Sequence, residues 1–168
     1  MTERMTLPAS RIAAGAAAGL IAGLAASLAM DLFQRATQPS GDDGEPATQQ
    51  AADGIARDVT GEPLSNQAKP LGGQLVHYGL GAALGVGYGI AAEFAPVVTA
   101  GFGTVFATGV WATLDEATVP ALRLGDPPWK ASPAIQAYSF ASHVVFGVAS
   151  EMARRIARRT IDRSATTA

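Results

Sequence analysis

The stretch HYGLGAALGVGYGIAAE, residues 77–93, decides the fold of this chain. Its glycines and its two outermost ionisable residues recur at every fourth position: His77, Gly81, Gly85, Gly89 and Glu93. In a helix this spacing puts all of them on one face. The surrounding segment 71–94 is apolar and longer than the ~20 residues that cross a bilayer. We therefore predict a transmembrane helix whose glycine face lets a neighbouring backbone approach closely.

The first apolar segment, residues 12–33, repeats this pattern. Its small residues and one carboxylate also recur at every fourth position: Gly15, Gly19, Gly23, Ser27 and Asp31. Such a small-xxx-small series predicts a second membrane-spanning helix with a face for close packing. A cleaved signal peptide is the alternative, since Arg4 and Arg11 precede the apolar run. The run is, however, longer than the roughly 7–15 residues usual in such a peptide.

Two further apolar segments, 97–114 and 134–152, bring the predicted number of spans to four. The segment 34–70 is polar, and we interpret it as a solvated outward loop, with a short surface helix over 47–59 as the alternative. The tail 153–168 carries five arginines, which the positive-inside rule assigns to the cytoplasm. Because four spans return the chain to its starting side, both termini are predicted to be cytoplasmic.

The two halves of the chain resemble each other. GLAASL at 23–28 is similar to GVWATL at 109–114, and GIAAE at 89–93 is similar to GVASE at 147–151. Each half would form a helical hairpin, and the two hairpins would be related as a parallel repeat. The predicted fold class is therefore an all-α, four-helix transmembrane bundle in one integral membrane domain, residues 1–168. The glycines expected to pack its helices are Gly15, Gly19, Gly23, Gly81, Gly85, Gly89 and Gly147.

The composition excludes several kinds of function. Charged residues make up 15% of the chain, below the ~25% typical of soluble domains, and 48% of residues are hydrophobic. The net charge of −2 offers no footprint for nucleic acid. The chain has no cysteine, and its two histidines are far apart, so no metal site is expected. No nucleophile–base pair or cofactor motif is present, and we predict neither an enzyme nor a cofactor.

Ionisable residues in or beside the apolar segments are the candidate functional residues, because such groups are costly in a membrane unless they are paired or hydrated. They are His77, His143, Asp31, Asp115, Glu116, Glu93 and Glu151. His143 lies about midway along the predicted fourth span. It is either satisfied by hydrogen bonds, for example from Tyr138, Tyr88 or Ser139, or it senses or relays protons.

The other candidates divide between the two membrane surfaces. At the outer one, His77 is expected to pair with Asp31, Asp115 or Glu116 and so form an acid-sensing cluster. At the inner one, Glu93 and Glu151 are expected to come close together and to form ion pairs with the arginines that follow Glu151.

Several phrases together resemble a known bacterial family. They are HYG at 77–79, GYG at 87–89 before Glu93, Asp115-Glu116 before Val119-Pro120, GDPP at 125–128, and SHVVFG at 142–147 before Glu151 and Arg154-Arg155. Over roughly 12–155 the chain resembles the YagU-like inner-membrane proteins, a domain family of unknown function. The resemblance implies a location in a bacterial inner membrane. It also implies a link to acid or envelope stress, since the namesake member is associated with acid resistance. It implies no established catalytic residues.

Two classes of function stay open at this point. The first is a non-enzymatic structural membrane protein that binds lipid or a partner, and the sequence slightly favours it. The alternative is a small proton or ion channel or transporter, with a polar path through His77, His143 and the span-end carboxylates. Membrane lipids and a second copy of the chain are the expected partners. A wet path from the outer carboxylates to His143 would favour transport, and a dry interior packed by glycines would favour the structural role.

Overall fold

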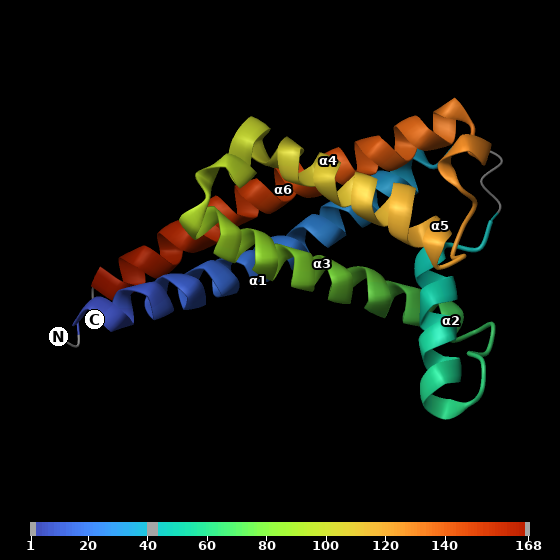
Figure 1. Ribbon diagram of the computed structural model, residues 1–168, viewed down its shortest axis with the longest axis horizontal. Coiled ribbons are helices and arrows are strands. Elements are labelled where there is room, and N and C mark those ends of the chain that lie inside the picture. The colour runs from blue at the N-terminus through green and yellow to red at the C-terminus, as the bar shows by residue number, and fades with distance from the viewer. Residues whose placement is uncertain (1–2, 40–43, 167–168) are drawn as a thin grey trace.

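A computed structural model describes residues 3–39 and 44–166, and in these residues the chain is helical and contains no strand. The helices are α1 (Glu3–Thr37), α2 (Ala47–Thr60), α3 (Lys69–Phe94), α4 (Thr104–Thr113), α5 (Val119–Ala121) and α6 (Pro133–Thr166). Helices α1, α3, α4 and α6 run along the molecule, both termini lie at one end, and α2 lies across the other end (Figure 1). The predicted all-α fold is confirmed.

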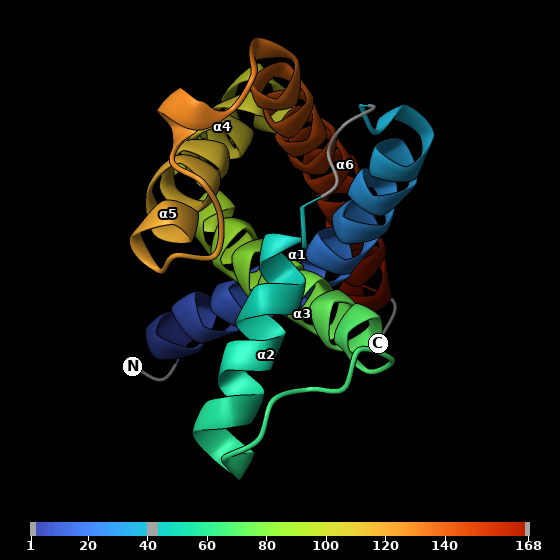
Figure 2. The same ribbon diagram turned by 90° about the vertical axis from the view of Figure 1, so that its right-hand side faces the viewer.

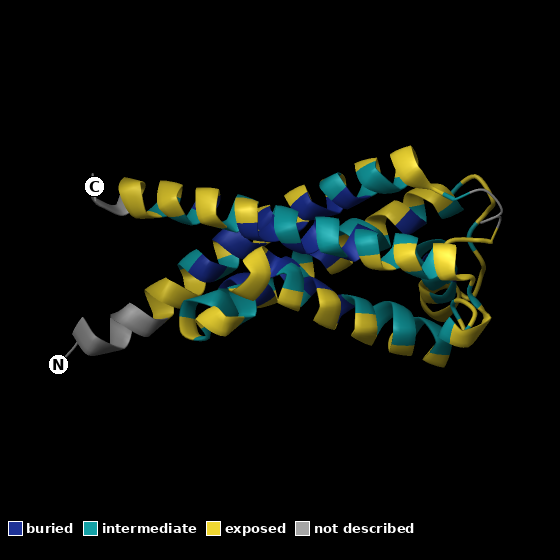
Figure 3. Ribbon diagram, turned by 90° about the horizontal axis from the view of Figure 1, so that it is seen from above, coloured by how far each residue is buried: buried dark blue, intermediate teal, exposed yellow. Residues whose placement is uncertain are grey.

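Within the described residues, three segments are long and apolar enough to cross a membrane: Ala9–Thr37, Lys69–Phe94 and Pro96–Ala121. Each contains one of the first three predicted spans. The third continues seven residues past its predicted end at Leu114, because Pro120 lies in the first turn of α5, where a proline does not break a helix. The predicted fourth span lies within α6, which is not among the three. Exposed residues cover the outside of the helices and buried ones lie between them (Figure 3).

Helix α1 is the central helix, since it packs against both α3 and α6. Its alanines at positions 18, 22 and 26 are completely buried. Ala26 and Met30 form a small apolar core with Phe146 of α6, and Leu84 of α3 packs against that core. Removal of α1 as a signal peptide would therefore leave α3 and α6 without their shared partner.

Helices α1 and α3 meet along a glycine seam, which we define as Gly15, Gly19 and Gly23 of α1 with Gly81, Gly85 and Gly89 of α3. A Cβ atom on Gly19 would overlap the carbonyl oxygen of Gly85, and a Cβ atom on Gly85 would overlap that of Gly19. A Cβ atom on Gly23 would likewise overlap the carbonyl oxygen of Gly81. The two backbones are thus in direct contact, as the four-residue spacing predicts.

A second glycine contact joins α6 to the segment that precedes α4. A Cβ atom on Gly147 would overlap the carbonyl oxygen of Gly103, and one on Gly103 would overlap that of Gly147. Gly103 has φ +86°, at a break where the 3₁₀ turn Pro96–Gly103 ends and α4 begins. Only glycine adopts this backbone conformation readily, and here it also allows the close approach.

The segment predicted as the loop 34–70 contains a well-formed helix, α2. The helix ends at Gly61, which has φ +81° and donates its backbone N–H to the carbonyl of Arg57. Asp53 is buried, and its carboxylate accepts the backbone N–H of Leu64 at 2.7 Å. Because α2 covers the whole of 47–59, the surface-helix alternative is the better description of this segment. The basic tail is also helical, because α6 continues to Thr166.

Candidate functional site

An open cavity of about 1260 Å³ lies between the long helices at the end that holds α2. Figure 2 looks onto this end of the molecule. Ser27 of α1, Leu84 of α3 and Phe146 of α6 line its deep part, and connecting segments line its mouth. The ionisable residues predicted at the outer surface all line it: Asp31, His77, Asp115 and Glu116. His143, predicted midway along the fourth span, lines it as well. We call this part of the molecule the open end.

Asp115 and His143 meet in the cavity wall. Asp115 lies in a π-helical turn, Leu114–Thr118, a distortion often found at functional sites. Its Oδ2 accepts a hydrogen bond from the Ser139 hydroxyl and lies 3.7 Å from Nδ1 of His143. Trp111 Nε1 donates to the same hydroxyl oxygen at 3.1 Å. Ser139 of α6, itself held by Trp111 of α4, thus keeps this carboxylate in place beside the histidine.

His143 is 6% exposed, and one nitrogen of its ring is hydrogen-bonded. Nδ1 lies 3.0 Å from the carbonyl oxygen of Ser139, which can only accept, so Nδ1 carries a hydrogen. Within the described part of the chain, no residue hydrogen-bonds Nε2. In the neutral ring Nε2 is the proton acceptor, and it is therefore the nitrogen available to a proton or a donor in the cavity.

The predicted pairing of His77 with a carboxylate is wrong. His77 Nε2 lies 3.2 Å from the carbonyl oxygen of Ser27, because this face of α3 is turned toward the α1 backbone. No acidic side chain of the described segments lies within 4.0 Å of His77. Asp31 forms an ion pair with Arg35, one turn further along α1, at 2.9 Å. The structure thus brings the outer residues to one cavity without joining them into one cluster.

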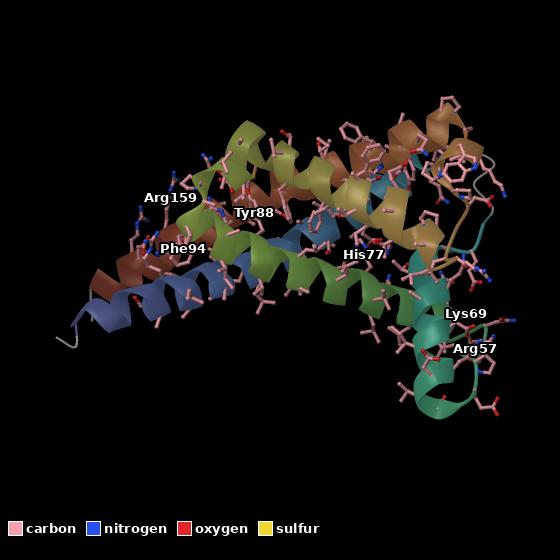
Figure 4. The ribbon with its side chains drawn as sticks, in the orientation of Figure 1. Arg57, Lys69, His77, Tyr88, Phe94 and Arg159 are labelled. Atoms are coloured by element: carbon pink, nitrogen blue, oxygen red, sulfur yellow. The ribbon has the colours of Figure 1, made fainter. Side chains whose placement is uncertain are left out.

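The opposite end is closed by ion pairs around Glu151, whose side chain is completely buried. Its carboxylate accepts the Tyr88 hydroxyl of α3 at 2.7 Å. It also accepts hydrogen bonds from Nε of Arg154 at 2.8 Å and from Nε of Arg155 at 2.6 Å. Both arginines lie one turn further along α6. Tyr88 and Phe94 lie toward this end, far from His77 (Figure 4).

Glu93 forms a second ion-pair group at this end. Arg158 of α6 donates to it from Nε at 2.7 Å, and Arg11 of α1 lies 3.6 Å away. The ends of α1, α3 and α6 are joined in this way. Glu93 and Glu151, expected to come close together, each have arginine partners of their own. We call the two groups together the closed end.

Aromatic rings and the small apolar core lie between the cavity and the closed end. The rings of Tyr88 and Phe106 stack with centroids 4.4 Å apart, and the ring of Phe146 lies 6.2 Å from that of Phe106. The cavity reaches Phe146, whereas Tyr88 and Glu151 are not part of its lining. It is therefore a blind cavity and not a continuous path.

Sequence reasoning missed several partners in both sites. The Ser139 hydroxyl donates to Asp115, and Trp111 donates to that hydroxyl. Arg11 and Arg158 form ion pairs with Glu93. The missed signal was helical spacing on α6, where Arg158 follows Glu151 by seven residues and so lies on the same face. Among the described residues, no group of three or more His, Asp or Glu side chains could hold a metal ion.

The fold defines the class: in its described residues the protein is all-helical, with three helices long and apolar enough to cross a membrane and a cavity with ionisable side chains at one end. The model of one family, described as a protein of unknown function (DUF1440), matches residues 20–152. The chain belongs to this family, and the match agrees with the YagU-like resemblance. No curated protein and no solved structure matches the chain.

Proposed function

We propose that this chain is a four-span protein of the bacterial inner membrane, in which α6 supplies the fourth span. The mean hydropathy of α6 is lowered by polar side chains over 134–152. Those that are buried in the protein are Ser142, His143, Ser150 and Glu151. The outward side carries large apolar residues such as Phe140 and Met152, which are 38% and 52% exposed. A helix whose polar residues face the bundle can cross a bilayer in spite of a low average.

The charges support an orientation with both termini in the cytoplasm. The C-terminal part of α6 carries five arginines, and Arg11 of α1 lies at the same end of the molecule. Basic residues that flank spans stay on the cytoplasmic side. The open end would then face outward, and the closed end would lie at the inner surface.

The blind cavity supports a transport-type role for protons or small cations, with no chemistry on the solute. Acidic residues outnumber basic ones in its lining. Three of its carboxylates are paired with arginine or lysine. These carboxylates are Asp31, Glu45 and Asp126. Within the described segments neither Asp115 nor Glu116 has a lysine or arginine at ion-pair distance. Carboxylates in a narrow cavity with apolar walls concentrate cations. The single observation that carries the proposal is this cavity, with His143 in its wall.

In this proposal the cavity is an outward half-channel, and the closed end is its inner gate. Passage to the cytoplasm would require the ion pairs of Glu151 to open, as in transporters that expose one side at a time. A structural or lipid-binding role is the second candidate, and the close-packed glycine seam favours it. The association with acid resistance stays a prediction of the resemblance, and membrane lipids and a second copy of the chain stay the proposed partners.

Flux measurements in liposomes test this proposal. We expect the purified protein to conduct protons or alkali cations when the outside pH falls from 8 to 5, with a loss of most of the flux in His143→Ala. The control is Glu62→Gln, an exposed residue outside the cavity, which should keep the wild-type flux. If folded wild-type protein gives no flux above empty liposomes at any pH, the structural role is the correct one.

A further inference from the structure

Helix α2 has an exposed apolar side that no described residue covers. Ile55 and Val59 lie one turn apart and are 56% and 78% exposed. The neighbouring Ala52 is buried against Gly72 at the start of α3. Ala52 and Val59 are seven residues apart and so lie within about 20° of each other around the helix. The first part of this side is held against α3, and the rest of it, with Ile55 and Val59, remains open to its surroundings.

The direction of this side follows from the position of Arg57. Figure 4 shows Arg57 on the side of α2 that is turned away from the bundle, where it pairs with Asp53 at 3.0 Å. Ile55 and Val59 are each two residues from Arg57, which is about 160° around a helix. They consequently point back toward the level at which the bundle is surrounded by lipid. Helix α2 itself lies across the long axis of the bundle (Figure 1).

We propose that α2 lies in the plane of the membrane and inserts Ile55 and Val59 into the interface of the lipid leaflet at the open end. The exposed apolar surface of α3 continues to this point, since Leu71 and Leu75 in its first turns are 62% and 68% exposed. Leu71 is next to Gly72, which packs against Ala52 of α2. The lipid that surrounds a spanning α3 is thus the neighbour of α2 as well.

A second marker of the interface lies at the same end. Trp129, in the short turn Pro128–Lys130 beside the cavity mouth, is 83% exposed. Tryptophan is enriched where membrane and water meet, because its ring is apolar and its N–H is polar. Trp129 and α2 would mark the same level of the bilayer.

The charge of α2 identifies the kind of lipid surface. The helix carries one basic residue, Arg57, and two acidic residues, Asp53 and Asp58. Attraction to anionic lipid requires clustered basic residues, so it cannot be the main force here. Insertion would depend on the apolar side chains, and the partner is a neutral, zwitterionic lipid surface. This inference requires α3 to span the membrane, and it is independent of the direction of insertion and of the role of the cavity.

Single-cysteine labelling of the full chain tests the proposal, since the natural sequence has no cysteine. Val59→Cys and Gly54→Cys would each carry a fluorescent label in phosphatidylcholine liposomes that contain nitroxide lipids. Gly54 is the control, because a Cβ atom there meets nothing within 4 Å and lies about 140° around the helix from Val59. We expect the label at 59 to be quenched several-fold more strongly than the label at 54, with no dependence on salt.

Three outcomes would overturn the proposal. Equal and weak quenching at both positions would put α2 in water. Quenching that appears only with anionic lipid, and disappears in salt, would make the contact electrostatic. Label-to-label contact at residue 59 that persists on dilution with lipid would make a second copy of the chain the occupant. Flux measurements are unaffected by any of these results, so the two proposals fail separately.

Discussion

At the closed end a carboxylate without any exposure, Glu151, is surrounded by a tyrosine and two arginines, whereas at the open end Asp115 and Glu116 face a cavity. Both ends were indicated by the same signal, acidic residues at the ends of apolar segments. The surroundings separate them. A buried carboxylate that is fully paired holds helices together, and a carboxylate that faces a cavity without an arginine or lysine partner can bind a proton or a cation.

Neutralising one carboxylate at each end is the sharpest test of this comparison and should give the largest effect. Glu151→Gln leaves Arg154 and Arg155 without their counter-charge, and breaking a buried pair costs about 3–5 kcal/mol. Glu116→Gln removes a half-buried charge with no ion pair in the described chain, and it should change stability by less than about 0.5 kcal/mol. Thermal unfolding in detergent measures both. Equal losses at the two ends would contradict the division made here.

The glycine seam connects the two ends, and a pair of alanine substitutions on α3 examines it. In Gly85→Ala the new methyl group would overlap the backbone of α1, and overpacking of this kind costs about 1–3 kcal/mol. Gly87→Ala is the matched control, because a Cβ atom there meets nothing within 4 Å. It should be neutral or stabilising, since alanine is favoured over glycine in a helix by about 1 kcal/mol.

The same thermal unfolding measurement decides the outcome. Separation of α1 from α3 in Gly85→Ala would also break the contact between His77 and the Ser27 carbonyl, which lies next to the seam. If both substitutions stabilise the protein equally, α1 and α3 are not in backbone contact.

The sequence predicted the first three spans and the glycine seam because both depend on local periodicity. A four-residue spacing identifies one face of one helix wherever that helix is placed. The predicted fourth span, 134–152, is not among the segments that are apolar enough to cross a membrane, and the reason is related. Its polar residues, such as His143 and Glu151, face the protein, and an average over the segment does not record which way a side chain points.

The contacts within each site could not be predicted in the same way. Tyr88 and Glu151 are 63 residues apart, and Asp115 and Ser139 are 24 apart. Such contacts depend on the rotation and register of two helices, and neither is encoded in local periodicity. The same limitation explains the wrong partner for His77. Its face of α3 was identified, but the α1 backbone that fills the space beside it was not.

A smaller effect is expected within the open end, where α2 carries a paired carboxylate. Burial alone would raise the pKa of Asp53. The N–H of Leu64 and the guanidinium of Arg57 nevertheless hold this pKa below its usual value of about 3.9. A carboxyl group whose folded pKa is depressed stabilises the fold above its unfolded pKa, and this contribution is lost as pH falls through the folded pKa. The end of α2 should therefore loosen only in acid, below about pH 4.

A spin label at Val59→Cys measures this loosening directly, as an increase in label mobility between pH 7 and pH 2. Asp53→Asn, which has no charge to lose, should remove the dependence on pH, whereas Asp58→Asn should keep it. A mobility change of the same size in Asp53→Asn would mean that another group titrates.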